Sequence, residues 1–473
     1  MLLVILLLAL LYALSTTAPD PELWHEVVLE EEFNRKRHAD IASFADYLAL
    51  EERLFAEVRE KVYTRTPRGE LHQLERYSAG SAADPARWET DWNRSFELRA
   101  KAPRGAVLLL HGMSDSPYSL SAIGRALHAN GYDVLGLRYP GHGTIPSGLL
   151  EVHWTDMTVA ARLAMMHLGS RHTDTPIHIM GYSTGAPIAL LYALEQLNDP
   201  SLPPPASLVM LSPAIAISPA AALAQWNHKL SYLPGLGGLA WLDIQPEFDP
   251  FKYKSFATNA AEQVHLLTRE VANGLAARPA AELAQLPPML VLKSAVDSTT
   301  STSAVVDGLL TYLAPGRHEY LLFDINRRGA NASILVNDPG PITERLLQDD
   351  SLPFTVTIVG NRDRESIEVV ARTKPPMSAD TNSEVELGKR WPQGMLSLSH
   401  IALPFPPEDP LYGAERPARR DHIFLGTMAI QGESHLLRVS SDWLLRARHN
   451  PFYDYMLERI SAWLENAEQP AQR

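Results

Sequence analysis

The sequence predicts an α/β fold in which a mostly parallel sheet is covered by helices on both faces. From Gly105 onward, short apolar runs alternate along the chain with segments of helical periodicity. The runs are apolar throughout, which is typical of parallel strands buried on both faces. A serine between two glycines at one strand-to-helix junction is the second observation that favours this class.

The elements follow one another in a regular order until the last third of the chain. The predicted strands are 105–112, 132–139, 176–180, 207–215 and 288–297, and the predicted helices are 119–130, 154–169 and 184–195. Beyond them, 318–325 reads as a further strand, and 354–361 with 367–373 as an added hairpin. This part of the chain ends in a polar, proline-containing stretch, 373–386. At the other end, the charged segment 21–63 predicts an amphipathic helical region, and 95–99 a possible strand.

Ser183 lies in the stretch HIMGYSTGAPIAL, 178–190, between Gly181 and Gly185. This is the pattern G-x-S-x-G between an apolar strand and a helix. The turn is tight enough to require small residues, and it exposes the serine hydroxyl beside the N-terminus of the next helix. Ser183 is therefore the candidate nucleophile, whereas a chance glycine–serine turn is the alternative.

A serine hydroxyl is a weak nucleophile at neutral pH, so it needs a histidine base and an acid that orients the histidine. In this topology the acid and then the histidine follow the serine along the chain. Asp297, at the end of the strand in VLKSAVDSTTST, is the candidate acid. Asp324, at the end of LLFDI, ranks second.

The histidine is harder to choose because the chain contains 17 histidines. His400 lies in the loop-like stretch LSLSHIALPFPPEDPLYG, after the last candidate strand, and is the preferred base. His318 begins a strand, and His422, His435 and His449 lie in the C-terminal segment.

The oxyanion that forms during acyl transfer needs backbone N–H donors. The loop HGMSDSP, 111–117, follows the first strand of the series. The candidate donors are the backbone N–H groups of Met113, in this loop, and of Thr184, next to the serine.

Composition and motifs exclude several other functions. The net charge of −13 argues against a nucleic-acid partner. The chain has no cysteine, so it can form no disulfide, thiolate metal site or cysteine nucleophile. No dinucleotide fingerprint, phosphate loop or zinc-protease pair is complete, so no cofactor and no metal are implied.

The N-terminus carries an unbroken apolar run, Leu2 to Leu14, without a preceding Lys or Arg. It ends in small residues, Thr16 to Ala18, as a signal peptide does, and is barely long enough to span a membrane. We expect residues 1–18 to anchor the protein in a membrane, or to direct its export to the periplasm or beyond if they are cleaved.

Five motifs together resemble the α/β-hydrolase superfamily: VLLLHGMSDSP, GLRYPGHGT, MGYSTGA, VLKSAVDSTTST and SHIALPFPPEDPLYG. The most similar branch groups monoacylglycerol lipases, lysophospholipases, carboxylesterases and serine aminopeptidases. The resemblance extends from about Trp92 to Ala467 and implies the same roles for Ser183, Asp297 and His400. It departs from the family in the stretch of about 100 residues between acid and histidine.

The resulting domain organisation has three parts. Residues 1–18 are the anchor or signal, 19–91 a helical N-terminal extension, and 92–467 the hydrolase domain. Within that domain, 216–286 is expected to be a cap, as the resemblance implies, and about 326–390 a further insertion. Apolar cap residues are expected to select an acyl group: Trp226, Tyr232, Leu233, Leu236, Leu239, Trp241 and Leu242.

The predicted function is serine hydrolysis of carboxylic esters of lipids or other apolar acyl chains. One alternative is a peptidase of the aminopeptidase type, in which Asp243, Glu247 and Asp249 would hold a substrate ammonium. Another is a non-catalytic binding module on a hydrolase fold. The sequence does not determine the oligomeric state.

Overall fold

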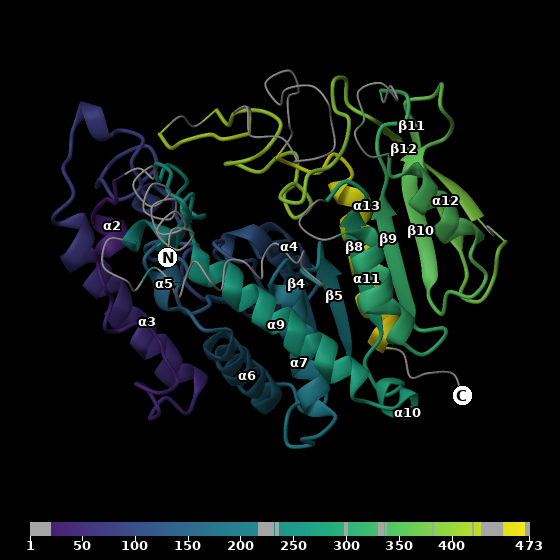
Figure 1. The fold of residues 1–473 in the computed structure, drawn as a ribbon, viewed down its shortest axis with the longest axis horizontal. Helices are drawn as coiled ribbons and strands as arrows, with labels where there is room; N and C mark the ends of the chain where they lie inside the picture. Colours follow the sequence, from purple (N-terminus) through teal and green to yellow (C-terminus); the bar gives the residue numbers. More distant parts are fainter. Residues whose placement is uncertain are drawn as a thin grey trace, which may run out of the picture.

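The centre of the molecule is a twisted sheet (Figure 1). The computed structural model describes residues 20–215, 231, 236–297, 301–329, 335, 338–380, 383–418, 421–426 and 448–468. Within these residues ten strands form this sheet, in the order β1-β3-β2-β4-β5-β8-β9-β10-β11-β12. The predicted α/β class is thereby confirmed.

The strands from β3 to β10 are parallel, and the others are antiparallel to their neighbours. The parallel strands are β2 (Gly105–Leu110), β3 (Tyr132–Leu137), β4 (Ile177–Tyr182), β5 (Ser207–Leu211), β8 (Met289–Ser294), β9 (His318–Phe323) and β10 (Thr355–Asn361); the others are β1 (Phe96–Leu98), β11 (Glu368–Lys374) and β12 (Ser383–Arg390). Every residue of β2, β3, β4, β5, β8 and β9 is buried, as their apolar sequences predict.

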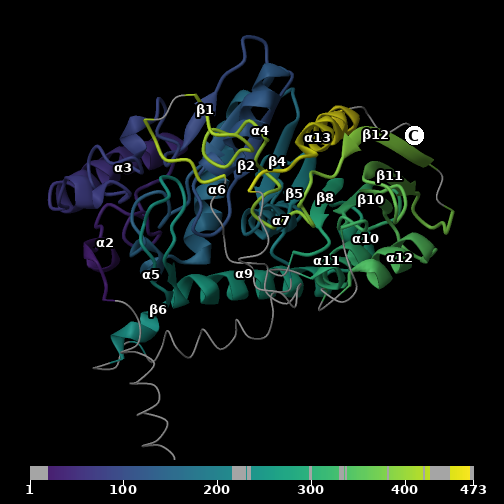
Figure 2. The ribbon, with the colours of Figure 1, turned by 90° about the horizontal axis from the view of Figure 1, so that it is seen from above.

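Helices cover both faces of this sheet (Figure 2). α4 (Tyr118–Ala129) and α13 (Tyr453–Glu468) pack on one face. The other face is covered by α6 (Trp154–Arg171), α7 (Gly185–Gln196), α9 (Thr258–Ala276), α11 (Thr302–Gly308) and α12 (Gly340–Gln348). Two apolar cores therefore lie on opposite sides of the sheet and hold its strands rigidly.

Shorter elements complete the described chain. They are α2 (Leu23–Glu26), α5 (Gly148–Glu151), α10 (Ala280–Leu283), the paired strands β6 (Trp241–Asp243) and β7 (Phe256–Ala257), and the single turns η1 (Arg59–Tyr63), η2 (Glu70–His72), η3 (Pro85–Arg87), η4 (Gly237–Ala240) and η5 (Leu310–Tyr312).

The N-terminal extension contains one long helix, α3 (Phe44–Val58), which packs beside α6. Ser43 caps it, because its hydroxyl accepts the Asp46 backbone N–H at 3.2 Å. Most of 27–42 is irregular, although the sequence predicted a helical region. The reason is tertiary, since this stretch presents the Glu32 carboxylate to a buried arginine of the body.

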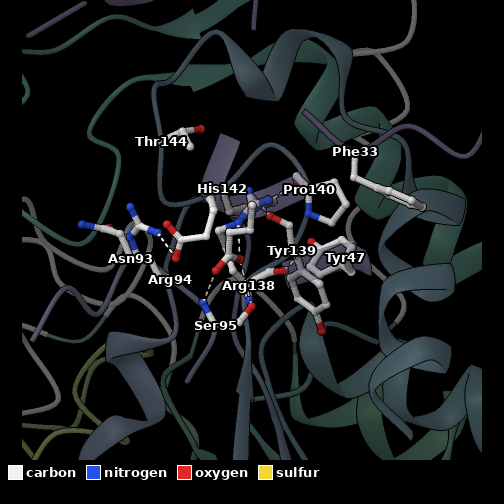
Figure 3. Close-up of polar contacts among 12 residues, drawn as sticks. Phe33, Tyr47, Asn93, Arg94, Ser95, Arg138, Tyr139, Pro140, His142 and Thr144 are labelled. Carbon is white, nitrogen blue, oxygen red and sulfur yellow. Dashed lines mark hydrogen bonds and ion pairs between the residues drawn. The ribbon is translucent and has the colours of Figure 1, made fainter. Parts of the chain in front are cut away.

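That arginine, Arg138, joins the extension to the body of the molecule (Figure 3). Its guanidinium is buried and contacts Glu51 Oε2 of α3 at 2.8 Å and Glu32 Oε1 at 3.2 Å. The Tyr47 hydroxyl donates to the Arg138 carbonyl at 2.8 Å, and the Arg138 backbone N–H donates to the Ser95 hydroxyl. The extension is therefore docked by polar as well as apolar contacts.

The segment predicted to be a cap contributes partly to the body. α9 and α10 lie within 216–286, and α9 packs against α7, α6 and α5 in the layer over the sheet. α9 follows β5 and precedes β8, which is the place of the crossover helix between two parallel strands. Trp226, Tyr232 and Leu233 lie outside the described residues. Trp241 packs edge-on against His25, with ring centroids 5.0 Å apart.

The insertion after β9 extends the central sheet. β10 pairs parallel with β9, and β11 pairs antiparallel with β10, so the predicted hairpin is confirmed. A further strand that was not predicted, β12, occupies Ser383–Arg390 and pairs antiparallel with β11. The polar sequence of β12 did not indicate a strand, because β12 is the mostly exposed edge strand of the sheet.

Candidate active site

Ser183 lies at the junction between β4 and α7, at the carboxyl edge of the sheet. Its φ is 52°, a left-handed conformation that is rare for a residue with a side chain. Its backbone N–H donates to the carbonyl of Leu211 at 2.9 Å, and its carbonyl accepts the Ala214 N–H at 3.1 Å. These bonds to the end of β5 and the residues after it hold the strained serine in place.

The two glycines of the motif are required by close backbone approach. A Cβ on Gly181 would stand 2.4 Å from the backbone of Gly185, and one on Gly185 would stand 2.0 Å from the carbonyl oxygen of Leu110. Both distances are far below van der Waals contact. The helix thus begins directly against β2 and β4, which gives the sharp turn that the motif predicts.

His400 and Asp297 are joined by a hydrogen bond of 2.9 Å between Nδ1 and Oδ2. They are 103 residues apart in the sequence, and both are buried. A carboxylate on Nδ1 holds the proton at that nitrogen and leaves Nε2 as the basic nitrogen. The His400 ring lies 5.5 Å from the ring of Tyr182, the residue before Ser183.

The loop that carries His400 is laid across the ends of β8 and β9. The Ser294 hydroxyl donates to the Leu398 carbonyl at 2.7 Å. The Asn326 backbone N–H donates to the Leu396 carbonyl at 2.7 Å, and its side-chain amide donates to that of Met395. The chain therefore leaves the sheet edge after β12 and returns to the strand that carries Asp297.

Lys293 is a second partner of Asp297 that the sequence analysis missed. Its Nζ lies 3.2 Å from Asp297 Oδ2, and both side chains are fully buried. Burial opposes ionisation of Asp297, but His400 and Lys293 outweigh it and hold the pKa of the carboxyl well below its usual range. The position gave little signal, since an isolated lysine within an apolar strand is not part of a known catalytic pattern.

The loop after β2 lies against Ser183, the candidate nucleophile. A Cβ on Gly112 would stand 3.1 Å from Ser183 Cβ, so only glycine lets the two segments approach this closely. Ser114, with φ 64°, bends the loop, and its carbonyl accepts the Tyr253 backbone N–H at 2.9 Å. In the part of the chain that the structure describes, the backbone N–H groups of Met113 and Thr184 have no acceptor.

His142, from the GHGT motif, supports the same loop. Its Nε2 lies 3.2 Å from Met113 Sδ, and its ring lies edge-on to that of His111. Burial lowers the pKa of His142 to about 4 and that of His111 well below its usual value. Both rings are therefore neutral at pH 7, and they add no charge beside the candidate oxyanion donors.

The competing acid and histidines make other contacts. Both oxygens of Asp324 accept hydrogen bonds from Arg327, each at 2.9 Å. His318 Nδ1 accepts the Met289 backbone N–H, and His422 stacks on Trp88 at 4.2 Å. His435 lies outside the described residues.

The acids proposed for a substrate ammonium are occupied within the protein. Glu247 accepts the backbone N–H groups of Lys254 and Ser255, and Asp249 accepts the hydroxyl of Tyr412 at 2.5 Å. Asp243 is exposed and accepts a hydrogen bond from the side chain of Gln245.

Comparison with known proteins agrees with this architecture. Residues 101–270 match the family described as serine aminopeptidase, S33, a hydrolase family. The matched range contains the loop after β2 and the Ser183 turn. The chain has the α/β-hydrolase fold, and over residues 101–270 it is similar to this hydrolase family. The resemblance stated from the sequence is thereby confirmed, although the matched range ends before Asp297 and His400.

Solved structures similar to this hydrolase include lipolytic enzymes. One is reported for LipS and LipT, two metagenome-derived lipolytic enzymes, with 19% identity over 49% of this chain and 87% of that chain and a TM-score of 0.39. A monoacylglycerol lipase of Paleococcus ferrophilus has 20% identity, coverages of 49% and 88%, and a TM-score of 0.37. A monoglyceride lipase variant of Saccharomyces cerevisiae has 16% identity, coverages of 49% and 82%, and a TM-score of 0.37. No curated protein matches the sequence.

A large cavity and the question of membrane-spanning helices concern parts of the chain away from the candidate site. A cavity of about 940 Å³ lies between the N-terminal extension and residues 244–248, and the described residues that line it do not include Ser183, Asp297 or His400. Within the described ranges, no helix is long and apolar enough to cross a membrane. The predicted anchor, residues 1–18, lies outside those ranges.

Proposed function

We propose that this hydrolase cleaves carboxylic esters with an apolar acyl chain, using Ser183 as nucleophile, His400 as base and Asp297 as the acid that orients it. The observation that carries the proposal is the buried 2.9 Å bond between His400 Nδ1 and Asp297 Oδ2, at the same sheet edge as the Ser183 turn. Buried pairs of a histidine and a carboxylate also occur as purely structural contacts. Here Ser183, the third residue of the proposed triad, lies on a strained turn, and the glycines of that turn are required by close backbone contact.

The reaction follows from the geometry. His400 Nε2 takes the proton of the Ser183 hydroxyl as Oγ attacks the ester carbonyl, and the protonated ring then gives the proton to the leaving alcohol. Asp297 remains ionised and stabilises the imidazolium. The N–H groups of Met113 and Thr184 hold the oxyanion. In the second half of the reaction His400 takes a proton from water as the water attacks the acyl-enzyme, and His400 then returns a proton to Ser183 Oγ as the carboxylic acid leaves.

In the described part of the chain, the Ser183 hydroxyl has no hydrogen-bond partner. The serine–histidine bond of the mechanism is thus expected to form when substrate binds, because such bonds are often long in the free enzyme.

The contacts of the three acids proposed to bind a substrate ammonium support an ester substrate over a peptide substrate. A substrate ammonium needs a carboxylate that is free to receive it. Glu247 and Asp249 already accept hydrogen bonds from the protein, and Asp243 is exposed to solvent.

Two measurements test this function. A fluorophosphonate probe should label the full-length wild-type protein, and Ser183→Ala should abolish labelling and lower ester turnover by on the order of 10⁶, as in the worked triad case. Labelling of Ser183→Ala would refute the nucleophile. A panel of p-nitrophenyl esters should show kcat/KM rising about fourfold per methylene, since each buried methylene contributes about 0.8 kcal/mol. A profile that favours acetate alone would refute the apolar acyl group.

A further inference from the structure

A small cavity of about 60 Å³ lies beside the candidate catalytic residues. Tyr182, which precedes Ser183, and Ile401, which follows His400, both line it. Asp115 lines it too. A Cβ placed on Gly112 would lie 2.8 Å from Asp115 Oδ2 and 3.1 Å from Ser183 Cβ, so Asp115 lies close to the candidate nucleophile. The cavity has room for about four waters, or for one group the size of a phosphate or a carboxylate.

Cations outnumber acids in its wall. Lys252, Lys254 and Arg448 line the cavity, together with the acids Asp115 and Asp249. Both acids have partners within the protein. Asp115 Oδ1 binds Lys252 Nζ at 2.6 Å, and Asp249 accepts the Tyr412 hydroxyl and the backbone N–H of Phe251.

Arg448 is the unusual member of this wall. Its side chain is buried, with the residue only 5% exposed. Among the residues that the structure describes, no carboxylate pairs with its guanidinium and no hydrogen bond satisfies it, and its Nε is buried without an acceptor. Its one described interaction places it 5.3 Å from the ring centroid of Tyr412.

Lys254 is a second cation without a carboxylate partner in the described ranges. Its Nζ lies 5.2 Å from the ring centroid of Phe248. Burial lowers the pKa of Lys254, and the charges of Arg448 and Lys252 act in the same direction, against the opposing effect of Asp249. The three cations are thus close enough to repel one another.

A buried guanidinium is costly unless an anion pairs with it. Among the residues that the structure describes, no carboxylate pairs with Arg448, and the cavity lies beside the Ser183 turn. We infer that Arg448 and Lys254 bind an anionic group, phosphate or carboxylate, that the ester substrate carries near its scissile carbonyl. The inference rests on the proposed ester hydrolysis and narrows its substrate class from neutral to negatively charged esters.

Matched ester pairs test the inference and locate the charge. On the alcohol side, octanoylglycerol is compared with octanoylglycerol phosphate. On the acyl side, p-nitrophenyl butyrate is compared with the mono-p-nitrophenyl ester of glutaric acid. We expect kcat/KM to favour the charged member of one pair by at least about tenfold, because each hydrogen bond to a charged group changes affinity by about ten- to a hundredfold.

Variants connect this preference to the cavity. Lys254→Gln and Arg448→Gln should each reduce the ratio of kcat/KM for the charged ester to that for the neutral ester by about tenfold. Lys101→Gln, at an exposed lysine remote from the cavity wall, is the control and should keep the ratio. If Arg448→Gln does not fold, Lys254→Gln and the charge-conserving Arg448→Lys carry the test.

Equal kcat/KM within both pairs, or a ratio that both charge-removing variants leave intact, overturns the inference. Binding separates this failure from failure of the proposed function. Ser183→Ala should bind octanoylglycerol phosphate more tightly than octanoylglycerol by calorimetry, and Lys254→Gln in the same background should remove the difference. If the wild-type protein cleaves no ester, the proposed function is refuted. The difference in binding between the two ligands then tests by itself whether the cavity binds an anion.

Discussion

At the scale of single residues, the structure distinguishes two aspartates that the sequence left in competition. Asp297 contacts His400 and Lys293, whereas Asp324 is held by Arg327. Both follow a strand of the same sheet, β8 or β9, so strand position alone did not separate them.

Asp297→Asn should therefore lower kcat by about 10⁴, the cost of the equivalent change in the worked serine–histidine–aspartate case. Asp324→Asn is the matched control, because it replaces the same residue type at the end of the neighbouring strand. It should leave kcat near that of the wild type and lower only the free energy of unfolding. Loss of turnover in Asp324→Asn with full turnover in Asp297→Asn would reverse the assignment.

Glu247 offers a test by pH. Burial raises the pKa of Glu247 from 4.5 to about 7, against the opposing effect of the Lys254 and Ser255 N–H groups. Between these values the folded protein holds a proton that the unfolded chain has lost. The stability from this residue is therefore full below pH 4.5 and is lost as the pH rises toward 7.

Glu247→Gln should remove this pH dependence. The difference in the free energy of unfolding amounts to about 3 kcal/mol across the window, at about 1.4 kcal/mol per pKa unit. Urea unfolding at several pH values measures it, with Glu282→Gln, at an exposed position of α10, as the control. Parallel pH curves for the wild type and Glu247→Gln would contradict the prediction.

At the scale of elements, α3 and the chain before it are held to the body through Arg138. Glu51 of α3 and Glu32 share its buried guanidinium, and Glu51 also accepts the N–H and hydroxyl of Ser95. A buried ion pair adds little net stability over an apolar contact, but removing one partner leaves an uncompensated charge.

Glu51→Gln should thus lower the free energy of unfolding by about 3 kcal/mol. The next residue provides the control. Glu52 is 73% exposed and pairs with Arg94 at 2.8 Å, so Glu52→Gln should cost less than about 1 kcal/mol. Urea denaturation compares the two, and equal changes would show that the buried network does not hold the extension.

The elements after β9 explain how a distant histidine reaches Asp297. β10, β11 and β12 extend the sheet by three strands, and the chain then crosses back over the ends of β8 and β9. The long insertion, a departure from the family pattern, is thus built into the sheet instead of standing apart from it.

At the scale of the whole molecule, an apolar run precedes the layered body in the sequence. It lies outside the residues that the structure describes. We propose that Leu2 to Leu14 holds the protein at a membrane. The full chain should sediment with membranes, and a chain beginning at Asp20 should stay in the supernatant. The shortened chain should keep its kcat on a water-soluble ester, since α3 and the Arg138 contacts remain. Equal solubility of both chains would refute the anchor.

The sequence by itself determined the α/β class, most strands from β2 to β11, and the Ser183 turn. These features depend on local physics, because strands buried on both faces must be apolar throughout and a tight turn must contain glycine. It did not reveal β12, whose exposed polar edge resembles a loop. Only the tertiary structure decided which of 17 histidines lies beside which acid, and that Lys293 and Arg138 are buried in ion pairs. Such contacts join residues up to 106 positions apart, and their stability depends on burial and on neighbouring charges, which the order of residues along the chain does not display.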